Sequence, residues 1–173
     1  VSSAISYPDI AELTITITSP ETANAITGLT LTDDLPAGLI IATPANASTT
    51  CNDSSIPTLT ADPNTTTISI IDGSLPAALT GDVSCEIVVD VTVEREASSG
   101  TYTNTIGEGA IGTSDPNGPT NTFEESVGLG VEAVSIDKSF QYAGFEAGTT
   151  NTLTVTLTNP TTETYVNAAF DDI

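Results

Sequence analysis

Few residue types in this chain could perform catalytic chemistry. The sequence has no histidine, 23 acidic residues and only two basic side chains, Arg95 and Lys138. A His-dependent catalytic triad is therefore excluded. Carboxylates are abundant, but nothing indicates two of them facing each other across a cleft, as a glycosidase requires. Lys138 could form an intramolecular isopeptide bond to an Asn or Asp beside a Glu, although an ordinary linker lysine is the simpler interpretation. We expect no enzymatic activity and no resident cofactor.

Cys51 and Cys85 are the only two cysteines. An even count in a threonine-rich, lysine-poor chain favours one disulfide and an oxidising, extracellular setting. The bond would close a loop of about 35 residues and stabilise the fold by on the order of 3 kcal/mol. The alternative is two unpaired, buried cysteines, because neither a histidine nor a third cysteine completes a zinc site.

Three N-glycosylation sequons begin at Asn46, Asn52 and Asn64. Their number is what chance gives in a chain so rich in serine and threonine. Their placement is more informative, because all three fall within residues 46–66, a loop-rich stretch where a glycan would extend into solvent. We therefore expect covalent glycans on some of these asparagines.

Paired aspartates offer a candidate calcium site. Asp33 and Asp34 end one predicted strand, and Asp171 and Asp172 end a second one. Calcium prefers several oxygen ligands, which often lie at loop ends. The spacing matches neither an EF-hand nor a calcium-binding nonapeptide. A solvated acidic rim is the alternative interpretation of the same four residues.

The charge of the chain excludes two kinds of partner. The formal net charge is −21 at pH 7. A surface of this sign repels nucleic acid and anionic membranes, so we expect neither as a partner. No stretch approaches the roughly 20 apolar residues of a membrane helix, so we expect no membrane insertion in this segment. The chain starts at Val1 rather than Met, which indicates a processed product or an excised fragment.

The elements that would position these residues are strands. Apolar and polar residues alternate with period two along Leu13–Thr18, Cys85–Glu94 and Phe123–Val131, which is typical of half-buried antiparallel strands. Turn signals rich in Gly, Pro, Asn and Asp separate the runs. Weaker strands are expected near Leu39–Thr43, Thr66–Ile71 and Thr101–Ile111. The pattern predicts an all-β chain with an immunoglobulin-like antiparallel β-sandwich.

One strand occurs twice. Leu13–Pro20 returns 140 residues later as Leu153–Pro160, with five of eight positions identical. A second predicted strand follows each copy, over Ile26–Asp34 and Val166–Asp172. We therefore divide the chain into a sandwich over residues 1–132 and a C-terminal strand extension over 133–173, which links to and starts a second repeat. Two strands cannot bury an apolar face alone. The residues expected to contact another repeat or subunit are Leu153, Val155, Leu157, Tyr165 and Phe170.

Several motifs resemble one family. Leu31–Leu39 looks like a "TDTLPAGL" segment, and Gly100–Thr105 is similar to a "GTYTNTA" strand. Lys138–Phe140 and Ala147–Pro160 resemble the lead-in to the next repeat. The chain thus resembles the conserved-repeat domains (domain of unknown function eleven) of large bacterial surface proteins, in which these motifs occur. The resemblance implies an immunoglobulin-like fold, tandem arrangement and surface or extracellular placement, and no catalytic residues. Ser6–Asp9 departs from the usual Lys-Ser-Phe lead-in.

Together these features predict a non-enzymatic, extracellular structural protein. It would be a glycosylated subunit of a filament or surface stalk, joined head-to-tail by strand addition or tandem repetition. Its partners would be copies of itself or neighbouring repeats. The alternative is an adhesin module that recognises a glycan or a host protein. Five of the eight aromatic residues lie from Phe140 onward, near the repeat junction, and this favours assembly over ligand binding.

Overall fold

The computed structural model describes residues 4–20, 24–115, 118–144, 146–160 and 164. Within these ranges all regular elements are strands, and no helix occurs that could span a membrane. The strands, in chain order, are β1 (Ile10–Ser19), β2 (Ile26–Asp34), β3 (Leu39–Ile41), β4 (Ser48–Thr49), β5 (Thr58–Ala61), β6 (Thr67–Leu75), β7 (Val83–Val93), β8 (Gly100–Ile106), β9 (Glu125–Val131), β10 (Ser135–Phe140) and β11 (Leu153–Thr158).

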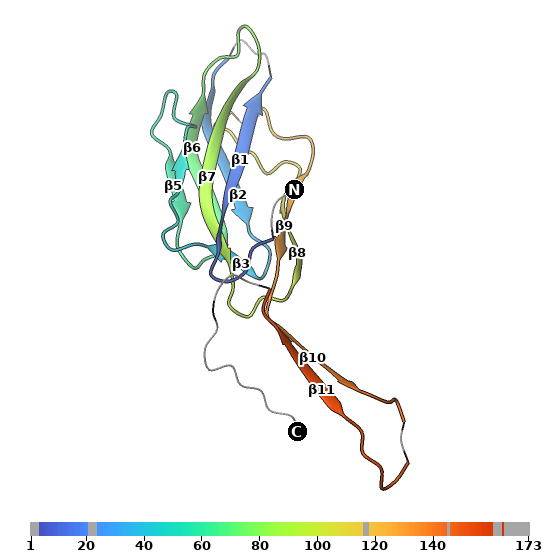
Figure 1. The fold of residues 1–173 in the computed structure, drawn as a ribbon. Coiled ribbons are helices and arrows are strands. Elements are labelled where there is room, and N and C mark those ends of the chain that lie inside the picture. Colours follow the sequence, from blue (N-terminus) through green and yellow to red (C-terminus); the bar gives the residue numbers. More distant parts are fainter. Residues whose placement is uncertain (1–3, 21–23, 116–117, 145, 161–163, 165–173) are drawn as a thin grey trace.

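The strands form antiparallel ladders, as the sequence predicted. One sheet has the order β1-β7-β3, with β4 also paired to β7, and a second has the order β2-β6-β5. Two further ladders pair β8 with β9 and β10 with β11. In Figure 1 the first nine strands make up an elongated body. The arrangement is consistent with a β-sandwich.

Side-chain alternation explains why the sheets bury their facing surfaces. Residues at every second position of a strand point to the same face. On β7 the odd-numbered residues from Cys85 to Val93 are all buried, and on β6 Ile68 and Ile70 are buried. These side chains form one apolar cluster with residues of β2 and β3. The predicted inward face of residues 85–94 is therefore confirmed.

The disulfide predicted from the cysteine count is present. Cys51 and Cys85 are bonded with an S–S distance of 2.04 Å. Both residues are buried, so the bond ties the connection after β4 to the central strand β7. The link constrains a long loop of the unfolded chain, which is the origin of its stabilising effect. A disulfide is compatible with a secreted or extracellular protein.

The N-terminal segment contacts the end of β9, whereas β1 pairs with β7. Ile5 forms a parallel bridge with Val131 at the end of β9, and the Glu132 amide donates a hydrogen bond to the Ile5 carbonyl at 2.9 Å. Strand β1 then pairs along its whole length with β7, from Ile10 opposite Thr92 to Ser19 opposite Val83. In the described part of the chain no strand pairs with the other edge of β1.

The β10–β11 hairpin projects from the body, as Figure 1 shows. Its register sets Phe140 opposite Leu153, Lys138 opposite Val155 and Ile136 opposite Leu157. Directly opposed residues of an antiparallel pair share a face. One face of the hairpin therefore carries five apolar side chains with Lys138 at its centre, and that face is largely exposed.

Candidate functional site

A groove of about 860 Å³ runs along the open edge of β1. Residues from Glu12 to Pro20 form one wall, and residues of β2, β8, β9 and the loop before β9 form the floor and the opposite wall. At about 3.3 Å per residue, this stretch of β1 is long enough to pair with a strand of six residues or more. The groove therefore has the length of a β-strand and an unpaired backbone edge along one side.

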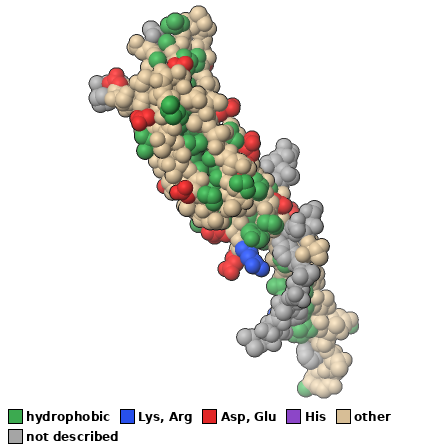
Figure 2. All heavy atoms as spheres, turned by 90° about the vertical axis from the view of Figure 1, so that its left-hand side faces the viewer, with side chains coloured by type: hydrophobic (Ala, Val, Ile, Leu, Met, Phe, Trp, Pro, Cys, Tyr) green, Lys and Arg blue, Asp and Glu red, His purple; other side chains and the backbone are tan. Residues whose placement is uncertain are grey.

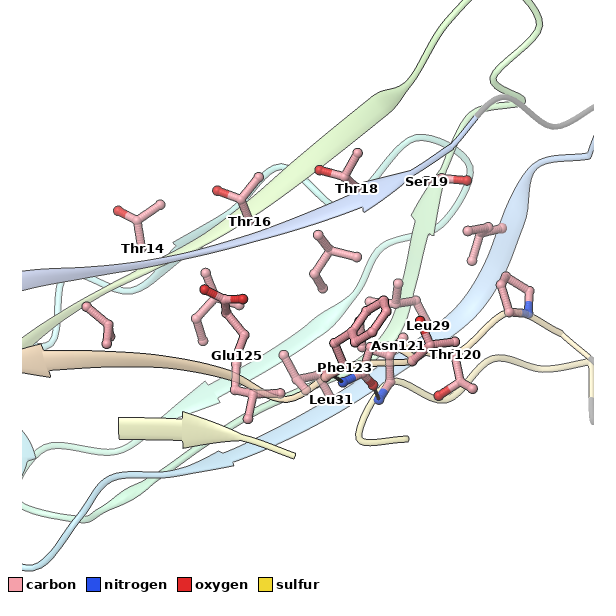
Figure 3. Close-up of a pocket in the computed structure, with 18 of the residues that line it drawn as sticks. Thr14, Thr16, Thr18, Ser19, Leu29, Leu31, Thr120, Asn121, Phe123 and Glu125 are labelled. Atoms are coloured by element: carbon pink, nitrogen blue, oxygen red, sulfur yellow. Dashed lines mark hydrogen bonds between the residues drawn. The ribbon is translucent and has the colours of Figure 1, made fainter. Parts of the chain in front are cut away.

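The two faces of β1 differ in what they present. Figure 3 shows Thr14, Thr16 and Thr18 pointing away from the groove. The intervening residues Leu13 and Ile15 line the groove and are only half-buried. The inward face of β1 is thus apolar and incompletely covered, which is unfavourable in water.

The opposite wall is also apolar and exposed. Phe123 is 81% exposed and Val127 is 57% exposed, and both line the groove. The sequence predicted that these two residues belong to the half-buried face of a strand. That prediction is wrong for Phe123, which precedes β9, and the exposure of Val127 shows that this end of the β9 face lies uncovered. Asn121 holds the loop in place, since its side-chain amide donates to the carbonyl oxygens of Gly107 at 2.7 Å and Phe123 at 2.9 Å.

Asn104, which lines the groove, forms a buried polar pair with Asp33. Asn104 of β8 is 6% exposed and Asp33 of β2 is 1% exposed. The Asn104 Nδ2 donates a hydrogen bond to Asp33 Oδ2 at 2.7 Å. The remaining oxygens, Asp33 Oδ1 and Asn104 Oδ1, are buried without a hydrogen-bond partner. Both are acceptors, so the pair lacks a donor, and such a deficit in a protein interior is costly.

Three effects act on the pKa of the Asp33 carboxyl. Burial raises the pKa of the Asp33 carboxyl above its usual value of 3.8, the hydrogen bond from Asn104 lowers it, and the charge of Asp34 raises it further. The net direction is upward. Burial is the dominant physical cause, because low polarity disfavours the ionised carboxylate.

Strand alternation in the sequence contains a signal for this pair. Asp33 lies on the same face of β2 as the buried Leu29 and Leu31. Asn104 likewise lies between the half-buried Tyr102 and Ile106 on β8. Strict alternation therefore places both polar side chains in the core. The interpretation of Asp33 as part of a solvated rim is wrong.

The calcium prediction gains no support from the described residues. Asp34 is exposed and accepts a hydrogen bond from Thr67 Oγ1 at 2.6 Å. Asp171 and Asp172 lie outside the described residues. No cluster of three or more His, Cys, Asp or Glu side chains suited to a metal ion occurs in the ranges that the structure describes.

The three sequon asparagines all lie on the exposed surface of the body. Asn46 and Asn64 adopt positive φ angles of 42° and 63°, which are typical of turns. The side-chain amide of Asn46 donates to Asp90 at 2.7 Å, and that of Asn64 to Thr43 Oγ1 at 3.3 Å. Exposure makes each site sterically open to a glycan, and glycosylation itself stays a prediction.

Three of the five predicted assembly residues lie on β11 of the hairpin. Leu153 and Leu157 are exposed and Val155 is half-buried, whereas Tyr165 and Phe170 lie outside the described residues. Figure 2 shows acidic side chains scattered over the body rather than gathered in one patch. No acidic cluster thus marks a separate binding site on the face in view.

Comparison with known families places most of the chain in one group. The family model of DUF7933, a domain of unknown function, matches residues 1–125. No curated protein and no solved structure matches the chain. The matched region contains all of β1 to β8, and therefore both the Asp33–Asn104 pair and the β1 wall of the groove.

Proposed function

Since the chain belongs to the DUF7933 family, a domain of unknown function, we propose that it is a non-enzymatic structural unit of an extracellular filament or surface stalk. Units join head-to-tail when a strand of one copy adds to the open edge of β1 in the next. The observation that supports this most directly is the apolar groove beside β1. An immunoglobulin-like sandwich with one strand position open is the architecture that we infer.

The two apolar surfaces of the chain complement each other. The groove presents an uncovered apolar wall on β1 and another near β9. The hairpin presents Phe140 at 62% exposure and Ile136 at 54% on one face. Covering both surfaces by one contact removes apolar area from water, and the ladder hydrogen bonds satisfy the free edge of β1.

This contact joins different surfaces of two copies. A heterologous contact of this kind does not close on itself unless the rotation between copies returns to the start. It therefore propagates into a chain of units. In a covalent tandem array the same contact would form between neighbouring repeats of one polypeptide, and the groove would be filled in the same way.

The extracellular location is supported by the disulfide between Cys51 and Cys85 and by the exposed sequons. Glycans at Asn46, Asn52 and Asn64 would shield a fibre from proteolysis. Intact-mass analysis of material from the native source tests this: we expect masses above the 17.6 kDa chain, and the bare mass would rule glycans out for that source.

Electron microscopy tests the proposal directly. We expect filaments from the full chain, and only single particles from a chain truncated after Glu132, which lacks the hairpin. A near-unchanged thermal midpoint of the truncated chain would serve as the control for folding of the body. Filaments of equal length from both proteins would refute strand addition by the hairpin. An adhesin would instead stay monomeric in both forms.

A further inference from the structure

Strand β11 shows how the open edge of β1 can be filled. Residues Leu153–Thr158 repeat Leu13–Thr18, so Val155 corresponds to Ile15. The partner of β11 is β10, whose Lys138 lies directly opposite Val155. A β10 strand that docks on β1 in the same register therefore sets Lys138 opposite Ile15.

This register suits the apolar groove. It sets Phe140 opposite Leu13 and Ile136 opposite Ile17, and both β1 residues line the groove. Opposed residues of an antiparallel pair share a face. The two apolar side chains of β10 therefore enter the groove on either side of Lys138, which enters it at the centre.

The floor of the groove carries what a buried lysine needs. Asn104 lines the groove together with Ile15, and its Oδ1 has no hydrogen-bond partner. The Oδ1 atom of the neighbouring Asp33 is also buried without a hydrogen-bond partner. A lysine ammonium supplies three donors and no acceptor, which is the complement of two unmatched acceptors.

We propose that Lys138 of a β10 strand docked on β1 of a second copy forms an isopeptide bond with Asn104, with Asp33 as the proton-transfer group. This inference rests on the proposed strand addition. It turns the contact between copies into a covalent one.

The reaction balances without any added reagent. The Asp33 carboxylate accepts a proton from the Lys138 ammonium, and the resulting neutral amine attacks Cγ of Asn104. Asp33 returns the proton to Asn104 Nδ2, the Cγ–Nδ2 bond breaks, and ammonia leaves. Ammonia takes up the second proton lost by the lysine nitrogen. One amide replaces another, the net by-product is an ammonium ion, and nothing is oxidised or reduced.

The site is built for this proton transfer. Burial, which raises the pKa of Asp33, also makes that carboxyl a stronger base toward the lysine ammonium. The hydrogen bond at 2.7 Å already holds Asp33 against the leaving nitrogen of Asn104. Fixed proximity of this kind lowers the barrier of an otherwise slow reaction between an amine and an amide.

A labelled peptide tests the bond. The acceptor is the full chain with Lys138→Arg, which cannot react through its own β10. The donor is a synthetic peptide of residues 133–141. We expect an adduct that survives boiling in SDS, with the summed mass less one ammonia. Fragment spectra should join Lys138 of the peptide to Asn104. The matched control is the same peptide with Lys138→Arg, for which adduct should fall to background.

The outcomes separate the two proposals. If the peptide binds in native gels but forms no adduct, the covalent bond is refuted and strand addition stands. If it neither binds nor reacts, this inference is refuted, while filament formation by the full chain still decides the proposed function. A bond mapped to Glu125 or any residue other than Asn104 overturns the assignment. Acceptor with Asp33→Asn, checked for an unchanged fold by circular dichroism, should lose most of the adduct.

Discussion

At the scale of single residues, the pair Asp33 and Asn104 stands out, because its polar atoms lie in the core with two oxygens unmatched. A buried carboxyl weakens the fold when it is ionised and its oxygens are not all hydrogen-bonded. The same arrangement is what a lysine from outside would complete. The two consequences can be tested separately, one by stability and one by chemistry.

Asp33→Asn should raise the free energy of unfolding at neutral pH by on the order of 1 kcal/mol, because it removes an ionisable group from the core. Burial raises the folded-state pKa of Asp33 above 3.8, so the folded chain holds the proton more tightly than the unfolded chain. The penalty therefore appears as pH rises above 3.8 and through the folded pKa. Urea denaturation across this range should show the advantage of the variant shrinking on acidification. An advantage that grows on acidification would contradict the pKa direction.

Gly38 illustrates a backbone requirement. Its φ is +100°, and a Cβ there would overlap the Tyr102 ring. We expect Gly38→Ala to cost about 2 kcal/mol of stability, because both strain and a clash are introduced. Gly107→Ala is the matched control, since Gly107 has open space around it. Equal thermal midpoints for the two variants would show that Gly38 tolerates a side chain.

At the scale of elements, the exposed face of the hairpin should control assembly without affecting the body. Ile136→Ser with Phe140→Ser removes the apolar side chains that would enter the groove. We expect loss of at least tenfold in association, as two buried apolar groups of this size contribute about 3 kcal/mol or more. Sedimentation velocity measures this. Asp137→Ser, on the opposite face of β10, is the control and should leave association unchanged. Equal association of both proteins would exclude this face from the contact.

Period-two alternation was sufficient to predict the long strands but not their partners. It missed the short strands β4 and β5, which lie in the stretch 46–66 that was expected to be loop-rich. The inward faces of β1 and β7 followed from the sequence because local patterning decides which side chains face a core. The open edge of β1 did not follow, since it depends on which strands meet in space. Phe123 looked like part of a buried face for the same reason: an apolar residue in a periodic row is buried only if another element covers it. Asp33 was expected at a solvated rim because aspartate is a charged residue type. Its position on the alternating face of β2 points to the core instead.

At the scale of the whole molecule, the net charge of −21 opposes self-association. Each copy that joins a filament adds like charge, and this repulsion is screened over about 10 Å at 0.1 M salt. We therefore expect filaments to lengthen as sodium chloride rises from about 0.01 to 0.15 M. Light scattering measures the change. Filaments that shorten with added salt would indicate that attraction between opposite charges, rather than apolar strand addition, joins the copies.

The central claim is that β10 of one copy lies beside β1 of the next in a single register. That register sets Ser139 opposite Thr14, because β11 pairs Thr154 with Ser139 and Thr154 corresponds to Thr14. Both side chains are exposed. Directly opposed residues of an antiparallel pair have Cα atoms about 4.5–5.5 Å apart, which is within the range that a disulfide spans.

Non-reducing electrophoresis of a Thr14→Cys, Ser139→Cys chain tests this claim most directly, in a Lys138→Arg background that removes the isopeptide route. Under mild oxidation we predict a ladder of disulfide-linked copies that collapses on reduction. The control pair, Thr18→Cys with Ser139→Cys, lies four residues out of register, about 13 Å along the strand, and should stay largely monomeric. No ladder from the matched pair, or equal ladders from both, would contradict docking of β10 on β1.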